Sequence, residues 1–174
     1  MALLVWTALS FPQESTAAPI KPKPPEKTPS TRKAKEIKWE DLMPPPDPQV
    51  VERYQAGKMD QMEVIKYLDT LGKQSIAELN KTYAKMPGYL VPLNMDAKQM
   101  ATELLLVPTI GACVHVPPPP PNQIVYIKYD RGLKVTEAAY TPYWVTGTLT
   151  VEKNKSQYSE ALYAITVDNI VEFE

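Results

Sequence analysis

The sequence predicts a mainly β fold with helices on its N-terminal side, an α+β chain whose five short strands close into a small OB-like β-barrel. Three observations predict this fold class. Nineteen prolines among 174 residues argue against a long helical bundle, because proline inside a helix breaks it. Two helical patterns with start and stop signals fall within residues 47–75. Five β-rich runs follow within residues 76–174, and closing them into a barrel leaves no exposed edge.

End signals define the two predicted helices. Asp47, followed by a proline, suits the N-cap of the first helix, which Gly57 ends. Asp60 and Glu63 have the spacing of a capping box at the start of the second helix, which Gly72 ends. We expect the two helices to cover one end of the barrel. The second helix has one apolar stripe that we expect to contact the core, and its members are Val64, Ile65, Leu68 and Leu71.

The five predicted strands are runs rich in β-branched, aromatic and aliphatic residues. They span residues 83–93, 100–107, 124–129, 143–149 and 163–173. Together with the helices they form one domain at residues 36–174. Within it, the helical lead-in occupies residues 47–75 and the barrel occupies residues 76–174.

The first 35 residues predict an export signal and a tether. Met1–Phe11 is apolar but too short to span a bilayer, and small residues suited to cleavage follow it, so residues 1–18 resemble a truncated signal segment. The alternative is a frayed apolar N-terminus of a cytosolic protein. Residues 19–35 are rich in proline and lysine, and we expect a disordered tether there.

The charge of the chain argues against a nucleic acid partner. Residues 12–35 carry a net charge of +4, whereas the remaining residues up to 174 carry thirteen basic and eighteen acidic side chains. The domain therefore lacks a basic groove of the kind that binds nucleic acid. A single cysteine excludes an internal disulfide, and a single histidine excludes a metal site built only from histidines.

A proline-rich run in the middle of the domain is the most unusual feature of the sequence. Five consecutive prolines predict a polyproline II rod, which cannot be a central strand because proline donates no backbone hydrogen bond. The rod suits docking by an aromatic-lined groove of a partner, or it packs on tyrosines of its own domain. Asn122 and Gln123 either cap the free carbonyl groups of the rod or present amides to a partner. The candidate partner-binding residues are Pro117, Pro118, Pro119, Pro120, Pro121, Asn122 and Gln123.

Cys113 and His115 precede the rod and allow three interpretations. Two residues apart on an extended chain, their side chains point to the same face and could together approach a Zn²⁺ ion. They could also act as a nucleophile and its base, although no oxyanion hole is evident. The third interpretation is structural, with Cys113 buried as a small hydrophobe. The structural interpretation is favoured, and metal binding is the stronger of the two functional ones.

The run GACVHVPPPPPNQIVYI at residues 111–127 resembles the signature of a bacterial envelope family, domain of unknown function 3299. Residues 86–93, 104–108 and 144–149 are similar to further strands of that family, and the WEDL segment at 39–42 resembles its opening. The resemblance spans residues 39–171. It implies an exported protein of a Gram-negative envelope, found beside ABC transporters in settings linked to zinc supply, and it implies no established enzymatic activity.

These observations together predict a non-enzymatic periplasmic accessory protein of an envelope ABC-type transport system, in zinc or other metal homeostasis. The expected partner is an envelope protein such as a transporter component, with membrane association only through partners. No cofactor is firmly indicated, and zinc is the candidate. The alternative function is a thiol-dependent envelope enzyme that uses Cys113 and His115.

Overall fold

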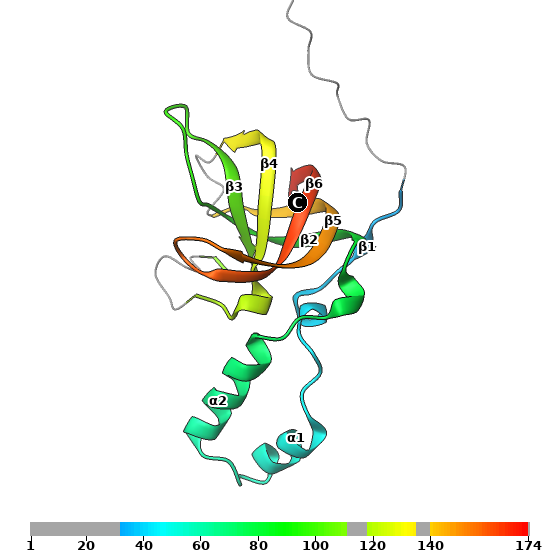
Figure 1. Ribbon diagram of the computed structural model, residues 1–174, viewed down its shortest axis with the longest axis vertical. Helices are drawn as coiled ribbons and strands as arrows, with labels where there is room; N and C mark the ends of the chain where they lie inside the picture. Colours follow the sequence, from blue (N-terminus) through cyan, green and yellow to red (C-terminus); the bar gives the residue numbers. More distant parts are fainter. Residues whose placement is uncertain (1–31, 111–117, 135–139, 174) are drawn as a thin grey trace, which may run out of the picture.

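The computed structural model describes residues 32–110, 118–134 and 140–173. This part of the chain is mostly β, with a few helices (Figure 1). Its strands are β1 (Lys35–Glu36), β2 (Thr82–Pro92), β3 (Met100–Val107), β4 (Val125–Lys134), β5 (Pro142–Lys155) and β6 (Glu160–Glu172). Its helices are α1 (Pro48–Gln55) and α2 (Gln61–Gly72), with 3-10 turns η1 (Trp39–Leu42), η2 (Ala77–Leu79) and η3 (Pro121–Gln123).

The six strands form one sheet in the order β1-β2-β3-β4-β6-β5, and β2 also pairs with β5. This additional pairing joins the two ends of the sheet, so hydrogen bonds run in a ring through β2, β3, β4, β6 and β5. The pairs β4–β6 and β1–β2 are parallel, and the other pairs are antiparallel. We refer to these five strands as the strand ring.

The five predicted β-rich runs correspond to β2 to β6, and the run at residues 100–107 matches β3 at both ends. The short strand β1 is an addition to the prediction. It begins at Lys35, inside the range assigned to the tether, and pairs with Ala84 and Lys85 of β2.

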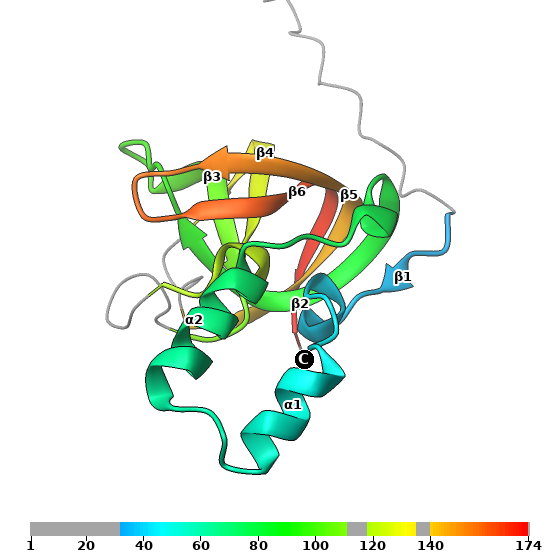
Figure 2. The ribbon, with the colours of Figure 1, turned by 60° about the horizontal axis from the view of Figure 1, so that its bottom comes forward.

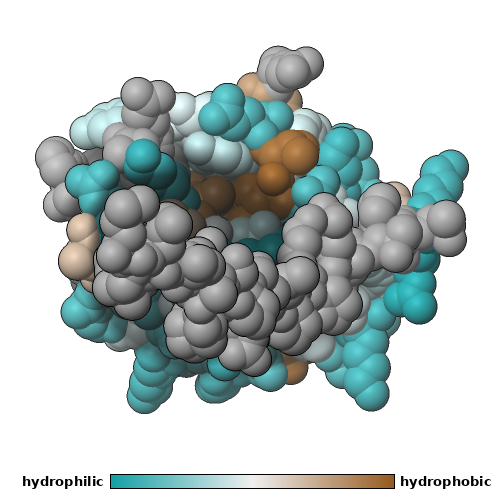
Figure 3. Space-filling model, turned by 90° about the horizontal axis from the view of Figure 1, so that it is seen from above, coloured by the Kyte–Doolittle hydropathy of each residue, from teal (hydrophilic) through white to brown (hydrophobic). Residues whose placement is uncertain are grey.

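The core lies inside the strand ring. Burial alternates along β2 and the first part of β5, as expected for strands with one buried face. Figure 3 shows a hollow on the upper face of the molecule, with hydrophobic residues at its centre and hydrophilic residues on part of its rim. The largest fully buried side chains include Met86, Leu90, Leu104, Leu106, Ile127, Leu149, Tyr163 and Ile165.

The two helices begin as the sequence predicts. The Asp47 carboxylate accepts a hydrogen bond from the Gln49 backbone N–H at 2.8 Å, which caps α1. Asp60 and Glu63 form the expected capping box, in which each side chain accepts a hydrogen bond from the backbone N–H of the other. α2 ends at Gly72, as predicted.

The expected cover of the strand ring by the helices is wrong. α1 and α2 form a hairpin that extends away from the strands and contacts them only near the C-terminal end of α2 (Figure 2). Of the predicted core stripe, Leu71 is buried, but Ile65 and Leu68 are 50% and 54% exposed. The physical reason is that Ile37, Leu42 and Leu79, from the segments before and after the hairpin, already pack on the core of the ring, so the core does not need the helices to cover it there. Among the described residues, none of the helices has the length and hydropathy needed to cross a membrane.

Candidate protein interaction surface

The described part of the proline-rich motif lies at the base of the helical hairpin. Cys113, His115 and Pro117 lie outside the described residues, so the prediction of a metal or thiol site stays a prediction. From Pro118 onward the chain passes the end of α2 and enters η3. Pro118 and Pro120 are exposed, whereas Asn122 is fully buried.

Asn122 holds the end of α2. Its side-chain amide donates hydrogen bonds of 3.0 Å to the backbone carbonyls of Leu71 and Gln74. These carbonyls belong to the last turn of the helix and the loop after it, where intrahelical donors run out. Gln123 donates in the same way to the carbonyl of Trp39, at 2.9 Å. Both amides therefore bond carbonyl groups inside the protein, but these carbonyls belong to the end of α2, to the loop after it and to η1, and not to the proline rod.

A close contact between Gly72 and Pro120 completes this junction. A Cβ atom at position 72 would lie 2.5 Å from the Cβ of Pro120, so only glycine lets the proline run approach the helix end this closely. Residues 118–123 and the end of α2 therefore form one packed unit, which we call the hairpin base. It ties the motif segment to the helical hairpin.

Tyr163 of β6 connects the hairpin base to the strand ring. Its hydroxyl donates to the carbonyl of Leu42 at 2.8 Å and accepts from the backbone N–H of Ile76 at 2.7 Å. Leu42 ends η1 before the hairpin, and Ile76 precedes η2 after it. Burial raises the pKa of the Tyr163 hydroxyl, which therefore stays protonated at neutral pH. One side chain thus fixes both ends of the hairpin segment.

Polar contacts also join α1 to α2. The hydroxyl of Tyr67 accepts a hydrogen bond from the backbone N–H of Asp47 at 2.7 Å. Arg53 forms an ion pair with Glu63, with 2.9 Å between Nη2 and Oε1. The backbone hydrogen bond from Asp60 and the hydrogen bond from Arg53 hold the pKa of Glu63 below its usual value of 4.5. The hairpin therefore keeps a defined shape although few of its residues are buried.

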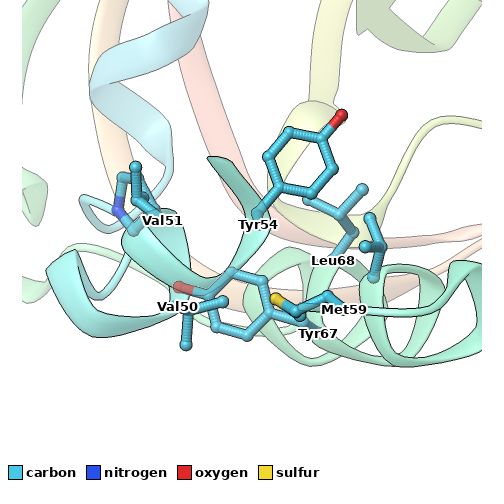
Figure 4. Close-up of a pocket in the computed structure, with 8 residues that line it drawn as sticks. Val50, Val51, Tyr54, Met59, Tyr67 and Leu68 are labelled. Carbon is cyan, nitrogen blue, oxygen red and sulfur yellow. The ribbon is translucent and has the colours of Figure 1, made fainter. Parts of the chain in front are cut away.

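An apolar groove runs between the two helices. It has a volume of about 300 Å³ and is open to solvent. Figure 4 shows side chains from both helices and from the turn between them that line it. The labelled lining residues are Val50, Val51, Tyr54, Met59, Tyr67 and Leu68.

Large apolar side chains of the hairpin face solvent, and of these Tyr54 and Leu68 line the groove, whereas Met62 and Ile65 line a separate open hollow along α2. Tyr54 is 62% exposed, Met62 is 71% exposed, and Ile65 and Leu68 are each at least half exposed. Met62, Ile65 and Leu68 are spaced by three residues, so they lie along one side of α2. We call the groove together with these exposed side chains the hairpin surface. In the part of the chain that the structure describes, no three His, Cys, Asp or Glu residues are placed to hold a metal ion.

Comparison with known proteins confirms the family resemblance. The family model described as "Protein of unknown function (DUF3299)" matches residues 39–172. The chain belongs to the DUF3299 family. A crystal structure of a DUF3299 family protein from Pseudomonas aeruginosa PAO1 is similar, with 33% sequence identity and a TM-score of 0.62. The similarity covers 82% of this chain and 98% of the other. No curated protein matches the chain.

The matched DUF3299 region includes the hairpin as well as the strand ring, because it begins at Trp39. The sequence analysis missed the hairpin surface because it assigned the apolar residues of α2 to a single buried stripe. The available signal was that Met62 lies on the opposite side of the helix from Leu71, because the nine residues between their positions make about two and a half turns. A helix that is apolar on more than one side needs more than one partner surface.

Proposed function

We propose that this DUF3299 protein is a non-enzymatic accessory protein of an envelope transport system, and that the hairpin surface docks onto an apolar helix of a transporter component. The observation that carries the proposal is the exposure of Tyr54, Met62, Ile65 and Leu68 on an element that extends away from the strand ring. Apolar surface gathered in one place on a soluble domain marks an interaction site. An open groove between two helices suits the apolar ridge of a third helix.

The charges beside the groove favour an uncharged partner surface. Arg53 is already paired with Glu63, and Lys73 is paired with Asp69 at 2.7 Å. These pairs leave little net charge with which to attract or orient a charged segment. The apolar residues of the groove supply the remaining contact area, so the hydrophobic effect would drive association.

Three parts of the proposal come from the sequence and the family resemblance. Export through residues 1–18, a periplasmic location and an ABC-type transporter as the partner all remain predictions. A role in zinc homeostasis, with Cys113 and His115 as ligands, also remains a prediction. The docking proposal does not depend on that pair, because every residue it uses belongs to the hairpin.

We also propose that the strand ring is an OB-like barrel. The connectivity supports this assignment. The five ring strands pair in the order first, second, third, fifth, fourth and back to the first, and the third and fifth are parallel. Barrels of this kind commonly bind their ligands on the face of the second and third strands. The turn between the first and second strands and the turn between the fourth and fifth strands border that face.

Site-specific photo-crosslinking in the native envelope tests the docking proposal. A photoreactive residue at position 68 is expected to crosslink to a transporter component, whereas one at Val171, 46% exposed at the end of β6, is not. The purified component should then bind the full chain. Replacing Ile65 and Leu68 by serine should weaken binding at least about tenfold, because each change removes apolar contact worth about 1–2 kcal/mol.

Salt dependence and the crosslinked product distinguish the alternatives. Affinity should change little between about 0.05 and 0.5 M salt, because the contact is apolar. Crosslinks from position 68 mainly to a second copy of the chain, or mainly to lipid, would overturn the proposal. Equal binding by the serine variant and by Val171→Ser would overturn it as well.

A further inference from the structure

A second pocket lies on the strand ring, away from the hairpin. It is open and has a volume of about 340 Å³. Its walls come from the residue after β2, from the middle of β3, from the start of β4, and from the end of β5 with the turn that follows it. Figures 1 and 2 both show the β2–β3 and β5–β6 turns reaching out on the same side of the ring. We call this site the turn pocket.

Hydrogen bonds give the turn pocket a defined shape. Gln157 in the β5–β6 turn donates from its amide to the carbonyl of Leu93 at 3.1 Å, which ties the turn to the end of β2. Within the turn, the Ser156 hydroxyl accepts hydrogen bonds from the backbone N–H groups of Tyr158 and Ser159 and donates to the Ser159 carbonyl. This wall of the pocket is therefore preformed, so binding a ligand would not require it to become ordered first.

Tyr126 supplies an anchored aromatic ring in the pocket. It packs against a small apolar cluster that includes Leu105 and Ile124. Glu103 lies diagonally across the β3–β4 pair, since Leu105 is the residue opposite Tyr126 in the register. Burial and then the nearby carboxylate of Glu103 raise the pKa of Tyr126, whose hydroxyl stays protonated at neutral pH. Packing against the apolar cluster holds the ring in place.

From these contacts we infer that the turn pocket binds an uncharged glycan. The pocket combines the aromatic ring of Tyr126 with the carboxylate of Glu103. Its further polar groups are the amides of Asn154 and Gln157 and the hydroxyl of Ser156. Sugar rings present hydroxyl groups that both donate and accept hydrogen bonds, and apolar C–H faces that pack on aromatic rings. Carboxylate and amide side chains can hydrogen-bond the sugar hydroxyls, and the ring of Tyr126 can pack on the apolar C–H face.

The charges of the pocket argue against phosphate-bearing ligands. The carboxylate of Glu103 faces the pocket, where it would repel a phosphate. Lys155 is the one basic residue of the lining, and its amine lies 3.9 Å from Glu160. Oligonucleotide binding needs a continuous positive groove, which this lining does not supply.

The position of the pocket in the connectivity is a second argument, which rests on the proposed OB-like barrel. It lies on the second and third strands of the ring, between the turn that joins the first two strands and the turn that joins the last two. OB-fold proteins bind oligosaccharides or oligonucleotides at this place. Of those two ligand classes, the lining favours the saccharide. The inference shares no residue with the hairpin surface, so it can fail or hold independently of the docking proposal.

Titration of the full chain with short glycans tests the inference. The probes are a tetramer of N-acetylglucosamine, which represents cell-wall glycan, and a tetramer of glucose, which represents an unacetylated glycan. Saturable binding of either, followed by calorimetry or by chemical shifts, is expected, and the tighter probe identifies the source. Tyr126→Phe, which removes the hydroxyl, and Gln157→Ala should each weaken binding about threefold to tenfold, as expected for the loss of one hydrogen bond.

Matched controls separate binding from folding. Gln157 is exposed, so its replacement by alanine should leave the melting temperature unchanged. Tyr54→Phe, the same change on the hairpin surface, should leave glycan affinity unchanged. The inference is overturned if neither glycan saturates the protein at millimolar concentrations. Wild-type affinity in both the Gln157 and the Tyr126 variant, or tighter binding of a single-stranded DNA tetramer, would also overturn it.

Discussion

The strand ring buries its apolar side chains, whereas the helical hairpin leaves most of its apolar side chains exposed. In the ring, side chains such as Leu90, Leu104 and Val145 are fully buried and pack in one cluster. In the hairpin, Leu71 and Gly72 at the end of α2 are buried, and no residue of α1 is. The ring is thus stabilised by its own core, whereas the hairpin keeps its place through hydrogen bonds and contacts at its base.

The strand ring and the hairpin are therefore stabilised by different interactions. The ring gains free energy from burying apolar area and from a closed set of strand pairs. The hairpin gains little from burial and relies on Asn122, Gln123 and Tyr163 to fix its two ends. A helical element that is held in place but left uncovered is suited to meeting a partner, and its local stability should be lower than that of the ring.

The largest expected effect comes from a change that disrupts the ring alone. At Gly147 in β5, which adjoins an irregularity in the β5–β6 register, an added Cβ would overlap the backbone carbonyl of Thr166. That carbonyl belongs to the paired strand and cannot move without breaking the pairing. We expect Gly147→Ala to lower the free energy of unfolding by about 3 kcal/mol or more. Chemical denaturation followed by tyrosine fluorescence measures this loss.

The same substitution at a glycine of the hairpin, Gly57→Ala, provides the comparison with Gly147→Ala in the ring. Gly57 follows α1 with a φ of 64°, and an added Cβ there would meet no atom within 4 Å. Gly57→Ala should therefore cost only the backbone strain, about 1–2 kcal/mol, and that cost should fall on the hairpin. An equal loss of global stability in both variants would contradict the distinction between ring and hairpin.

The next effect in size concerns the link between the two regions. Tyr163→Phe removes the hydrogen bonds that the carbonyl of Leu42 and the backbone N–H of Ile76 make with the Tyr163 hydroxyl. Such a loss costs about 1–3 kcal/mol. Amide exchange in residues 42–79 should accelerate more than in the ring, because both ends of the hairpin segment lose the same anchor. Tyr140→Phe, at a side chain that is 77% exposed, serves as the control and should change neither quantity.

Much of the ring could be predicted from the sequence, because strands and helix caps are local signals. The runs that became β2 to β6 alternate or concentrate β-forming residues over short windows, which one sequence reveals. The caps at Asp47 and Asp60 depend on side chains that bond the neighbouring backbone, so their spacing predicted both helix starts.

The placement of the hairpin and the candidate sites could not be predicted in the same way. The apolar residues of α2 look like core residues in the sequence, because a helix with exposed apolar side chains and a buried helix have similar patterns. Tyr163 meets Leu42 across 121 positions of the chain, and Tyr126 meets Glu103 through a strand register. Contacts of this kind depend on how distant segments pair, which no local pattern encodes.

The smallest expected effect, and the most selective one, is a loosening of the hairpin in acid. The carboxylate of Glu63 accepts hydrogen bonds from the Asp60 backbone N–H and from Arg53, and these bonds hold its pKa below 4.5 in the folded protein. The stabilisation from the carboxylate is therefore complete above the unfolded pKa of about 4.5. It disappears as the pH falls through the lower pKa of the folded state. Because Glu63 and both of its partners lie in the hairpin, the effect should be confined to the hairpin.

Amide exchange between pH 6 and pH 3, corrected for its intrinsic pH dependence, measures this loosening. Protection in α1 and α2 should fall below about pH 4.5, while protection in β2 and β5 stays constant over the same range. Glu63→Gln keeps a capping acceptor but cannot titrate. Amide protection in the hairpin of this variant should therefore be as weak at every pH as it is in the wild type in acid, and it should not fall further below about pH 4.5. The effect is small because Arg53 and Glu63 are about half exposed to solvent, where ion pairs contribute little. Simultaneous loss of protection in hairpin and ring at one pH would mean that the two regions unfold as a single unit, and the hairpin would then have no independent local stability.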